Sequence, residues 1–188
     1  MFWPFADLRP LSYGAILADP RWAFELRSEK GEEKAPQAHY GCMDLDAIKA
    51  LPVSHLAGGD CLLIMWATAP MLPQAIDTMA AWGFRFVSAG AWAKQSKTGQ
   101  KWAFGTGYVM RSAAEFFLVG ATGSPTYLSR AIRNLIVAPI REHSRKPDDM
   151  HLMIETLVAG PYLELFARSR RAGWDAWGNE TTKFGDAA

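Results

Sequence analysis

Cysteine is scarce in this sequence, and long apolar runs are missing from it. The chain of 188 residues has two cysteines, Cys42 and Cys61, and no apolar secretory signal at its start, so we expect reduced thiols in a cytoplasmic protein. The longest apolar run, Cys61 to Ala69, is too short to cross a bilayer, and we expect no membrane-spanning helix. His143 and His151 lack carboxylate or cysteine companions at ligand spacing, so we also predict no metal.

An overall surplus of charge is also missing, but the charges are unevenly placed along the chain. The formal net charge is +1, yet the segment from Lys94 to Lys146 carries nine basic residues against two acidic ones. A basic segment is typical of a phosphate-binding face, although a solvated basic surface gives the same pattern. With 49% hydrophobic residues, the chain is long enough for one compact domain with a real core.

One apolar stretch near the start ends in an unusual group of side chains. Tyr13 to Ala18 predicts a buried strand, and Asp19, Pro20 and Trp22 follow its carboxyl end, the edge where open α/β sheets bind ligands. Asp19 offers a carboxylate, Pro20 a carbonyl and Trp22 a flat ring face. Two neighbouring acceptors can hold both hydrogens of a planar exocyclic amine, which frees the nitrogen lone pair. This trio therefore predicts a site for a heteroaromatic amine.

The rest of the chain alternates between strand and helix patterns. Strands are expected over residues 61–68, 84–92, 115–120, 135–138 and 162–167, the last of these ending the regular structure. Helices are expected over 45–51 and 70–82, and a third is expected to begin at Pro147 and to close at Gly160. Strand, helix and strand over residues 61–92 are typical of a parallel crossover. We therefore predict an α/β protein with a doubly wound, mostly parallel sheet in a single domain.

Several short motifs occur in a fixed order between Tyr13 and Glu180. They are His39-Tyr40-Gly41-Cys42-Met43, Leu63-Ile64-Met65-Trp66-Ala67-Thr68, Trp82-Gly83-Phe84, Trp92-Ala93-Lys94, Gly105-Thr106-Gly107-Tyr108, Glu115 with Val119-Gly120, His143-Ser144-Arg145-Lys146-Pro147-Asp148, Glu164-Leu165-Phe166-Ala167-Arg168 and Trp177-Gly178-Asn179. Together with Asp-Pro-Arg-Trp at 19–22, they resemble the MT-A70 family of N6-adenine methyltransferases, in its bacterial or phage type. The family signature is Asp-Pro-Pro-Trp, and Arg21 stands here in place of the second proline.

The resemblance implies a Rossmann-like methyltransferase fold in which the base-binding motif precedes the cofactor motif. It divides the chain into a lead-in over residues 1–12, a methyltransferase domain over 13–180 and a C-terminal tail over 181–188. It implies S-adenosyl-L-methionine as the cofactor and Asp19, Pro20 and Trp22 as catalytic residues. The implied cofactor pocket consists of Asp19, Lys146, Glu164, Phe166, Arg168, Arg170, Arg171, Asn179 and Glu180.

A basic, ring-containing segment supplies most of the candidate substrate contacts. Lysines, glycines and aromatic residues interleave from Lys94 to Arg111, which fits nucleic-acid contact and fits equally a hairpin with surface lysines. Gly105-Thr106-Gly107 lacks the third glycine of a dinucleotide fingerprint. The predicted substrate-binding residues are Tyr40, Lys94, Lys97, Lys101, Tyr108 and Arg111. Tyr40 lines the base pocket in the family interpretation and anchors the following helix in the alternative one.

The resemblance implies direct methyl transfer to the N6 amine of adenine in nucleic acid. DNA is favoured over RNA, and a homodimer or a partner subunit is the expected assembly. Arg21 leaves a second hypothesis open, because it loosens the signature turn and adds a cation beside it. Under that hypothesis the protein is a weak or inactive methyltransferase-like subunit that binds nucleic acid or a catalytic partner. Methylation of a small amine is a third, weaker idea.

Overall fold

A mixed β-sheet organises the molecule. The computed structural model describes residues 3–22, 43–107 and 109–187, and within them seven strands form one sheet in the order β5-β3-β4-β2-β1-β6-β8. The strands are β1 (Tyr13–Ala18), β2 (Ala57–Ala67), β3 (Arg85–Gln95), β4 (Ala114–Thr122), β5 (Leu135–Pro139), β6 (Tyr162–Leu165) and β8 (Trp174–Trp177). β4 runs antiparallel to both of its neighbours, and the other neighbouring strands are parallel. A separate pair joins β7 (Arg170–Arg171) to β9 (Asp186–Ala187).

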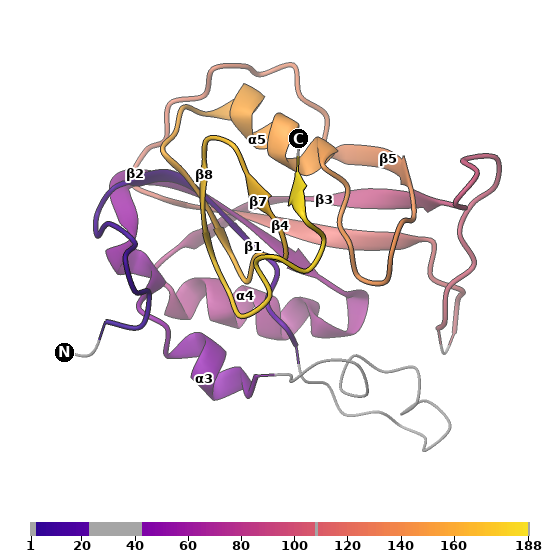
Figure 1. The fold of residues 1–188 in the computed structure, drawn as a ribbon, viewed down its shortest axis with the longest axis horizontal. Helices are drawn as coiled ribbons and strands as arrows, with labels where there is room; N and C mark the ends of the chain where they lie inside the picture. Colours follow the sequence, from indigo (N-terminus) through magenta and orange to yellow (C-terminus); the bar gives the residue numbers. More distant parts are fainter. Residues whose placement is uncertain (1–2, 23–42, 108, 188) are drawn as a thin grey trace.

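Helices cover both faces of this sheet. Figure 1 shows α3 (Leu45–Lys49) and α4 (Leu72–Ala81) on one face and α5 (Asp149–Leu157) on the other. Two short 3-10 turns, Val53–His55 and Ala69–Met71, precede β2 and α4. The sheet is therefore wound on both sides, as predicted for an α/β methyltransferase fold.

Two apolar clusters fill the space between the sheet and its helices. Successive side chains of a strand point to opposite faces, so Ile16 and Leu63 pack toward α4 whereas Leu17 and Ile64 pack toward α5. A β-carbon on Gly120 of β4 would lie 2.6 Å from the Met79 sulfur, so glycine permits the close approach of α4. These layers hold the strand ends in fixed positions.

The structure corrects the sequence prediction at four places. The β2-α4-β3 crossover links parallel strands, but β4 lies between them, because β4 pairs with both at once. Pro147 is not the first residue of α5, which begins at Asp149. The strand expected over 162–167 ends at Leu165, because Phe166 adopts a φ of 61°, and β8 follows as an unpredicted strand.

The lead-in packs on the C-terminal part of the sheet. Phe5 is fully buried, and its ring meets the Trp177 ring edge-on at 5.2 Å between centroids. The Trp177 indole N–H donates to the Pro4 carbonyl at 3.2 Å. Cys61 is a buried free thiol, and Cys42 lies outside the described residues. The predicted domain limits at residues 13 and 180 stay a prediction, and residues before Tyr13 already contribute to the core.

Candidate active site

Five polar side chains, in strands or in the connections that follow them, converge at one edge of the sheet. Asp19 directly follows β1, Lys94 is the penultimate residue of β3, and Arg168 lies just past β6. Because β4 runs in the opposite direction, its second residue, Glu115, comes to the same edge. Lys146 lies in the connection from β5 to α5. This is the edge where α/β sheets place their ligands.

Two cations hold the Asp19 carboxylate. The Lys146 ammonium lies 3.0 Å from Oδ1 and 2.9 Å from Oδ2, and Arg168 Nη2 lies 3.3 Å from Oδ2. The three side chains are 11 to 16% exposed, so the attraction is stronger than between charges at an open surface. Asp19 therefore faces the segment that follows β6, where the cofactor residues were predicted.

Lys146 also joins Asp19 to a second carboxylate. Its ammonium lies 3.2 Å from Glu115 Oε1, and the Lys94 ammonium lies 2.7 Å from Glu115 Oε2. Burial would raise the pKa of Glu115, but the charges of Lys146 and Lys94 outweigh it and lower that pKa to about 2. Burial would likewise lower the pKa of Lys146, but the charges of Asp19 and Glu115 outweigh it and raise that pKa. Both groups are therefore charged at neutral pH.

The turn after β1 is fixed by main-chain hydrogen bonds. The Trp22 N–H donates to the Pro20 carbonyl at 3.0 Å, and the Met43 N–H donates to the Arg21 carbonyl at 3.3 Å. The Pro20 oxygen keeps a second lone pair for a ligand. Trp22 itself is 6% exposed, and its indole N–H donates to the Trp66 carbonyl at 3.2 Å. The described structure thus uses Trp22 as a buried anchor of the turn, and its stacking on a base stays a prediction.

Arg21 reaches toward the C-terminal segment. Its Nη2 lies 2.8 Å from Glu180 Oε2, and its side chain is 12% exposed. The Lys183 ammonium contacts the two oxygens of the same carboxylate at 3.2 and 3.1 Å. The cation that replaces the second proline of the signature is therefore paired with an acid.

The predicted cofactor residues near β6 contact different parts of the structure. Glu164 Oε2 lies 2.8 Å from His151 Nε2 of α5, and both side chains are largely buried. Phe166 is buried, and its ring packs edge-on against Trp177 at 5.5 Å. Arg168, which contacts Asp19, also donates to the Ser144 carbonyl at 2.9 Å.

The more distal cofactor predictions are placed differently. Arg171 donates to Glu155 of α5 at 3.1 Å, and Arg170 is exposed in the β7-β9 pair. Asn179 is exposed in the turn after β8. The structure thus brings Lys146 and Arg168 directly to Asp19, whereas Arg171 contacts α5.

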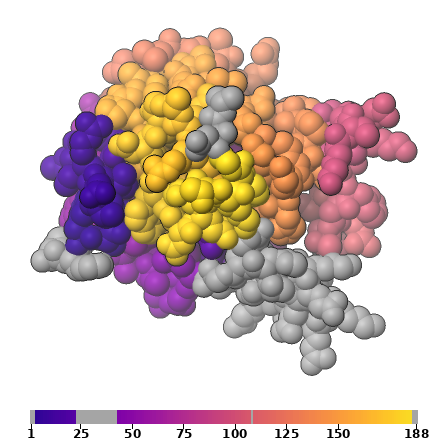
Figure 2. Space-filling model, viewed as in Figure 1, coloured from indigo at the N-terminus to yellow at the C-terminus, as the bar shows by residue number. Residues whose placement is uncertain are grey.

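The predicted substrate residues also differ in their exposure to solvent. Lys94 turns inward to Glu115 and is 24% exposed, whereas Lys97, Lys101 and Arg111 are exposed in the connection between β3 and β4. This connection projects from the body of the protein at the right of Figure 2. Tyr40 and Tyr108 lie outside the described residues.

Other cations of the basic segment are also paired. Arg141 binds Asp148 with both terminal nitrogens, at 2.7 and 2.9 Å, and Arg145 lies 3.2 Å from Glu142. The basic segment therefore contains largely buried ion pairs at Lys94 and Lys146, more exposed pairs at Arg141 and Arg145, and exposed lysines in the projecting connection.

Sequence reasoning assigned no site role to Glu115 or Trp66. The Lys146 ammonium lies 5.6 Å from the centre of the Trp66 ring, whose indole N–H is buried without a hydrogen-bond partner among the described residues. The hydroxyl of Thr68, the residue after β2, is likewise buried without a hydrogen-bond partner among the described residues. An acid inside an otherwise apolar strand was the available signal for Glu115. No local signal marks Trp66, because tryptophan is frequent in this chain.

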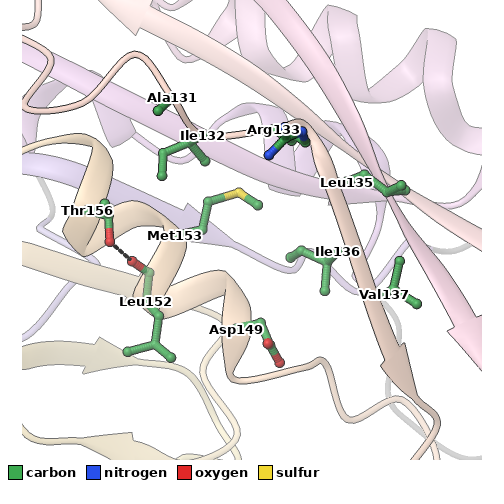
Figure 3. A pocket seen from close by; sticks show the side chains of 10 residues that line it. All are labelled: Ala131, Ile132, Arg133, Leu135, Ile136, Val137, Asp149, Leu152, Met153 and Thr156. Carbon is green, nitrogen blue, oxygen red and sulfur yellow. Dashed lines mark hydrogen bonds between the residues drawn. The ribbon is translucent and has the colours of Figure 1, made fainter. Parts of the chain in front are cut away.

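A clear hollow in the protein lies away from these residues. It has a volume of about 460 Å³ and lies between residues 131–137 and α5 (Figure 3). Its charged lining groups are Arg133 and Asp149, and the Thr156 hydroxyl donates to the Leu152 carbonyl of its own helix. None of the predicted site residues lines it, so convergent chemistry rather than cavity size identifies the site at Asp19.

The described residues contain neither a metal-ligand cluster nor a membrane-spanning helix. Among residues 3–22, 43–107 and 109–187, no group of three or more His, Cys, Asp or Glu side chains could hold a metal ion. In the same part of the chain, no helix is long and apolar enough to cross a membrane.

Comparison with known proteins identifies the relatives of this chain. The family model described as MT-A70 matches residues 13–180. This chain belongs to the MT-A70 family. MT-A70 relatives include a protein of Arabidopsis thaliana named N(6)-adenosine-methyltransferase MT-A70-like, 31% identical over 173 residues, which are 90% of this chain and 24% of that protein. A Drosophila melanogaster protein of similar name is 31% identical over 182 residues, or 94% of this chain and 28% of the relative.

A bacterial relative is matched over much more of its length. The type II methyltransferase M.MunI of Mycoplasma sp is 29% identical over 198 residues, which cover 94% of this chain and 81% of that protein. The chain thus spans about a quarter of the length of the plant and insect MT-A70 relatives and most of the bacterial one. The family membership confirms the resemblance and the fold predicted from the sequence.

Proposed function

We propose that this protein is an S-adenosyl-L-methionine-dependent methyltransferase that modifies the N6 amine of adenine in DNA. One observation carries the proposal: the Asp19 carboxylate, one residue before Pro20 at the tip of β1, faces Lys146 and Arg168. Membership of the MT-A70 family and the names of its relatives support the same chemistry. The bacterial type II methyltransferase, matched over 81% of its length, supports DNA as the substrate.

The donor set at this edge fits S-adenosyl-L-methionine. Lys146 and Arg168 are cations suited to its carboxylate, and Glu164 and Asn179 offer oxygens suited to its ammonium and ribose hydroxyls. The buried hydroxyl of Thr68 has no hydrogen-bond partner among the described residues, which leaves one more donor at the end of β2. When bound, the cofactor supplies an electrophilic methyl group on a sulfonium.

Asp19 and Pro20 prepare the amine for attack. An exocyclic amine is a weak nucleophile because its lone pair is delocalised into the purine ring. The Asp19 carboxylate and the free lone pair of the Pro20 oxygen each accept one amine hydrogen, which lets the nitrogen pyramidalise. As positive charge grows on that nitrogen, the fixed negative charge of Asp19 stabilises it without reorganising. Holding the amine in line contributes most of the remaining acceleration.

The Lys146 ammonium and the incoming amine both bind to the Asp19 carboxylate. In the structure its ammonium contacts both Asp19 oxygens and also Glu115 at 3.2 Å. Glu115 therefore gives Lys146 a second acidic partner, so that Lys146 stays charged and in place when the amine takes an Asp19 oxygen. The Lys94 contact at 2.7 Å fixes Glu115 for this task.

The connection between β3 and β4 is suited to nucleic acid. Trp102 is 63% exposed and Phe104 80% exposed, and the Arg111 guanidinium lies 5.3 Å from the centre of the Phe104 ring. Lys97 and Lys101 are exposed beside them. Exposed rings stack on bases and the cations neutralise phosphates, which together bind an unpaired strand. A target base in a duplex has to be flipped out first.

Methyl transfer to defined nucleic acids tests the proposal. The protein is incubated with methyl-labelled S-adenosyl-L-methionine and either unmethylated DNA or RNA of matched sequence, and the nucleosides are then separated. We expect label in N6-methyladenine from DNA, and none with Asp19→Asn. The control Asp77→Asn changes the same group on the surface of α4, where the side chain is 67% exposed, and should leave transfer unchanged.

The other outcomes change the proposed substrate or refute the proposed activity. Label found only in RNA would identify RNA as the substrate. Label on cytosine N4 would identify that amine, and not adenine N6, as the methyl acceptor. Absence of label, together with binding of nucleic acid and no calorimetric binding of the cofactor, establishes the non-enzymatic alternative and refutes the proposal.

A further inference from the structure

Arg21 and Glu180 are the feature of this site that the family signature does not explain. A second proline would restrict one backbone dihedral in the turn that carries Asp19 and Pro20. Arginine restores that freedom and adds a cation where positive charge develops. The structure shows an ion pair at 2.8 Å between Arg21 and Glu180, whose side chains are 12 and 26% exposed.

The partner of Arg21 is itself anchored to the site. Glu180 lies in the segment after β8, where the Phe184 N–H donates to the Arg168 carbonyl at 3.1 Å. The Ala167 N–H donates to the Trp177 carbonyl at 2.9 Å, which ties the same segment to β6. Arg168 contacts Asp19 at 3.3 Å. A closed circuit of contacts therefore runs from Asp19 through Arg168 and the C-terminal segment to Glu180, and back through Arg21.

We infer that Arg21 and Glu180 form a lock that positions the Asp19-Pro20 turn and that replaces the missing proline. In this lock Arg21 is a positioning residue: its guanidinium fixes the turn from outside, and Glu180, which Lys183 also contacts, offsets the charge that would oppose a cationic transition state. The predicted contact of Glu180 with the cofactor is then replaced by a role exerted through Arg21. This inference rests on the proposed function, since it concerns the geometry of that reaction.

A double-mutant cycle between Arg21→Pro and Glu180→Gln tests the lock, because proline removes the need for it. We expect Arg21→Gln and Glu180→Gln each to lower kcat roughly tenfold or more, since small misplacements of reacting groups are costly. Arg21→Pro should stay within about twofold of the wild type, because the ring restores the rigidity. In the Arg21→Pro background, Glu180→Gln should have no further effect on kcat or on cofactor KM.

A matched control separates the lock from a general loss of stability. Arg9→Gln removes an arginine that lies 3.8 Å from Asp175 in an exposed pair, and it should leave kcat unchanged. Thermal unfolding of each variant is recorded, and calorimetry gives the affinity for S-adenosyl-L-methionine. The positioning role predicts a fall in kcat that is larger than the change in cofactor affinity.

Two results overturn the inference while leaving the proposed function intact. The first is wild-type activity in Arg21→Gln. The second is an equal loss of cofactor affinity from Glu180→Gln in the arginine and proline backgrounds, which shows that Glu180 contacts the cofactor directly. Activity that appears only with Arg21→Pro is a different outcome: it refutes the lock and also the proposed activity of the wild type, because it shows that Arg21 impairs the turn. Absence of transfer by the wild type and every variant refutes the proposed function and this inference together.

Discussion

The buried carboxylate of Glu115 makes a quantitative prediction about stability and pH. Its pKa falls from an ordinary 4.5 to about 2 because Lys146 and Lys94 outweigh the effect of burial. One pKa unit corresponds to about 1.4 kcal/mol, so ionised Glu115 contributes about 3 kcal/mol to folding at neutral pH. Glu115→Gln keeps the size and removes the charge. We therefore expect it to lower the free energy of unfolding by about 3 kcal/mol at pH 7.

The sign of the pH dependence follows from the depressed pKa. The contribution of Glu115 is fully present above the unfolded value of 4.5 and is lost as the pH falls toward about 2. Urea unfolding of wild type and Glu115→Gln is measured from pH 7 down to the lowest pH at which both fold. The difference between them should shrink to roughly half near pH 3. Other titrating groups contribute to both proteins and largely cancel in the difference.

Glu142→Gln is the matched control for this experiment. Glu142 is an exposed acid paired with Arg145 at 3.2 Å, and its side chain is 58% exposed. An exposed ion pair contributes little, so this variant should unfold close to the wild type at every pH. A difference between wild type and Glu115→Gln that is constant from pH 6 to pH 3, or one as small as that of Glu142→Gln, would show that the two lysines do not stabilise the ionised form.

Three further predictions concern other parts of the molecule. Burial raises the pKa of the Cys61 thiol to about 12, so iodoacetamide should leave Cys61 unlabelled in the native protein and label it in urea; rapid native labelling contradicts the packing. Tyr13→Phe removes a 2.6 Å hydrogen bond to Asp175 and should cost about 1 kcal/mol in urea unfolding, whereas an unchanged midpoint denies that bond a role. Trp102→Ala should weaken binding of a single-stranded oligonucleotide roughly tenfold. Lys101→Gln should lower the slope of log affinity against log salt by about one. If both variants bind the oligonucleotide like the wild type, the connection between β3 and β4 does not bind nucleic acid.

Much of the fold could be predicted because local pattern and tertiary environment agree. The apolar runs in β1 and over residues 61–67 of β2 are buried on both faces of the sheet, so these sequences are continuously apolar and predict strands clearly. β8 escaped prediction because Trp174-Asp175-Ala176-Trp177 carries no such run and becomes a strand by pairing with β6. The position of β4 between β2 and β3 was likewise beyond reach, because strand order depends on packing between distant segments.

The candidate site shows the same division between local and distant information. The sequence by itself determined that an acid, a proline and an aromatic residue follow a buried strand, and that Lys146 and Arg168 come after other strand ends, because these are short-range patterns. Only the tertiary structure decided which charges meet. It joined Lys146 to both Asp19 and Glu115, and it paired Arg21 with Glu180, 159 positions further along the chain. Coulomb attraction depends on the distance between charges in space and on their burial, and the order of the residues along the chain gives neither directly.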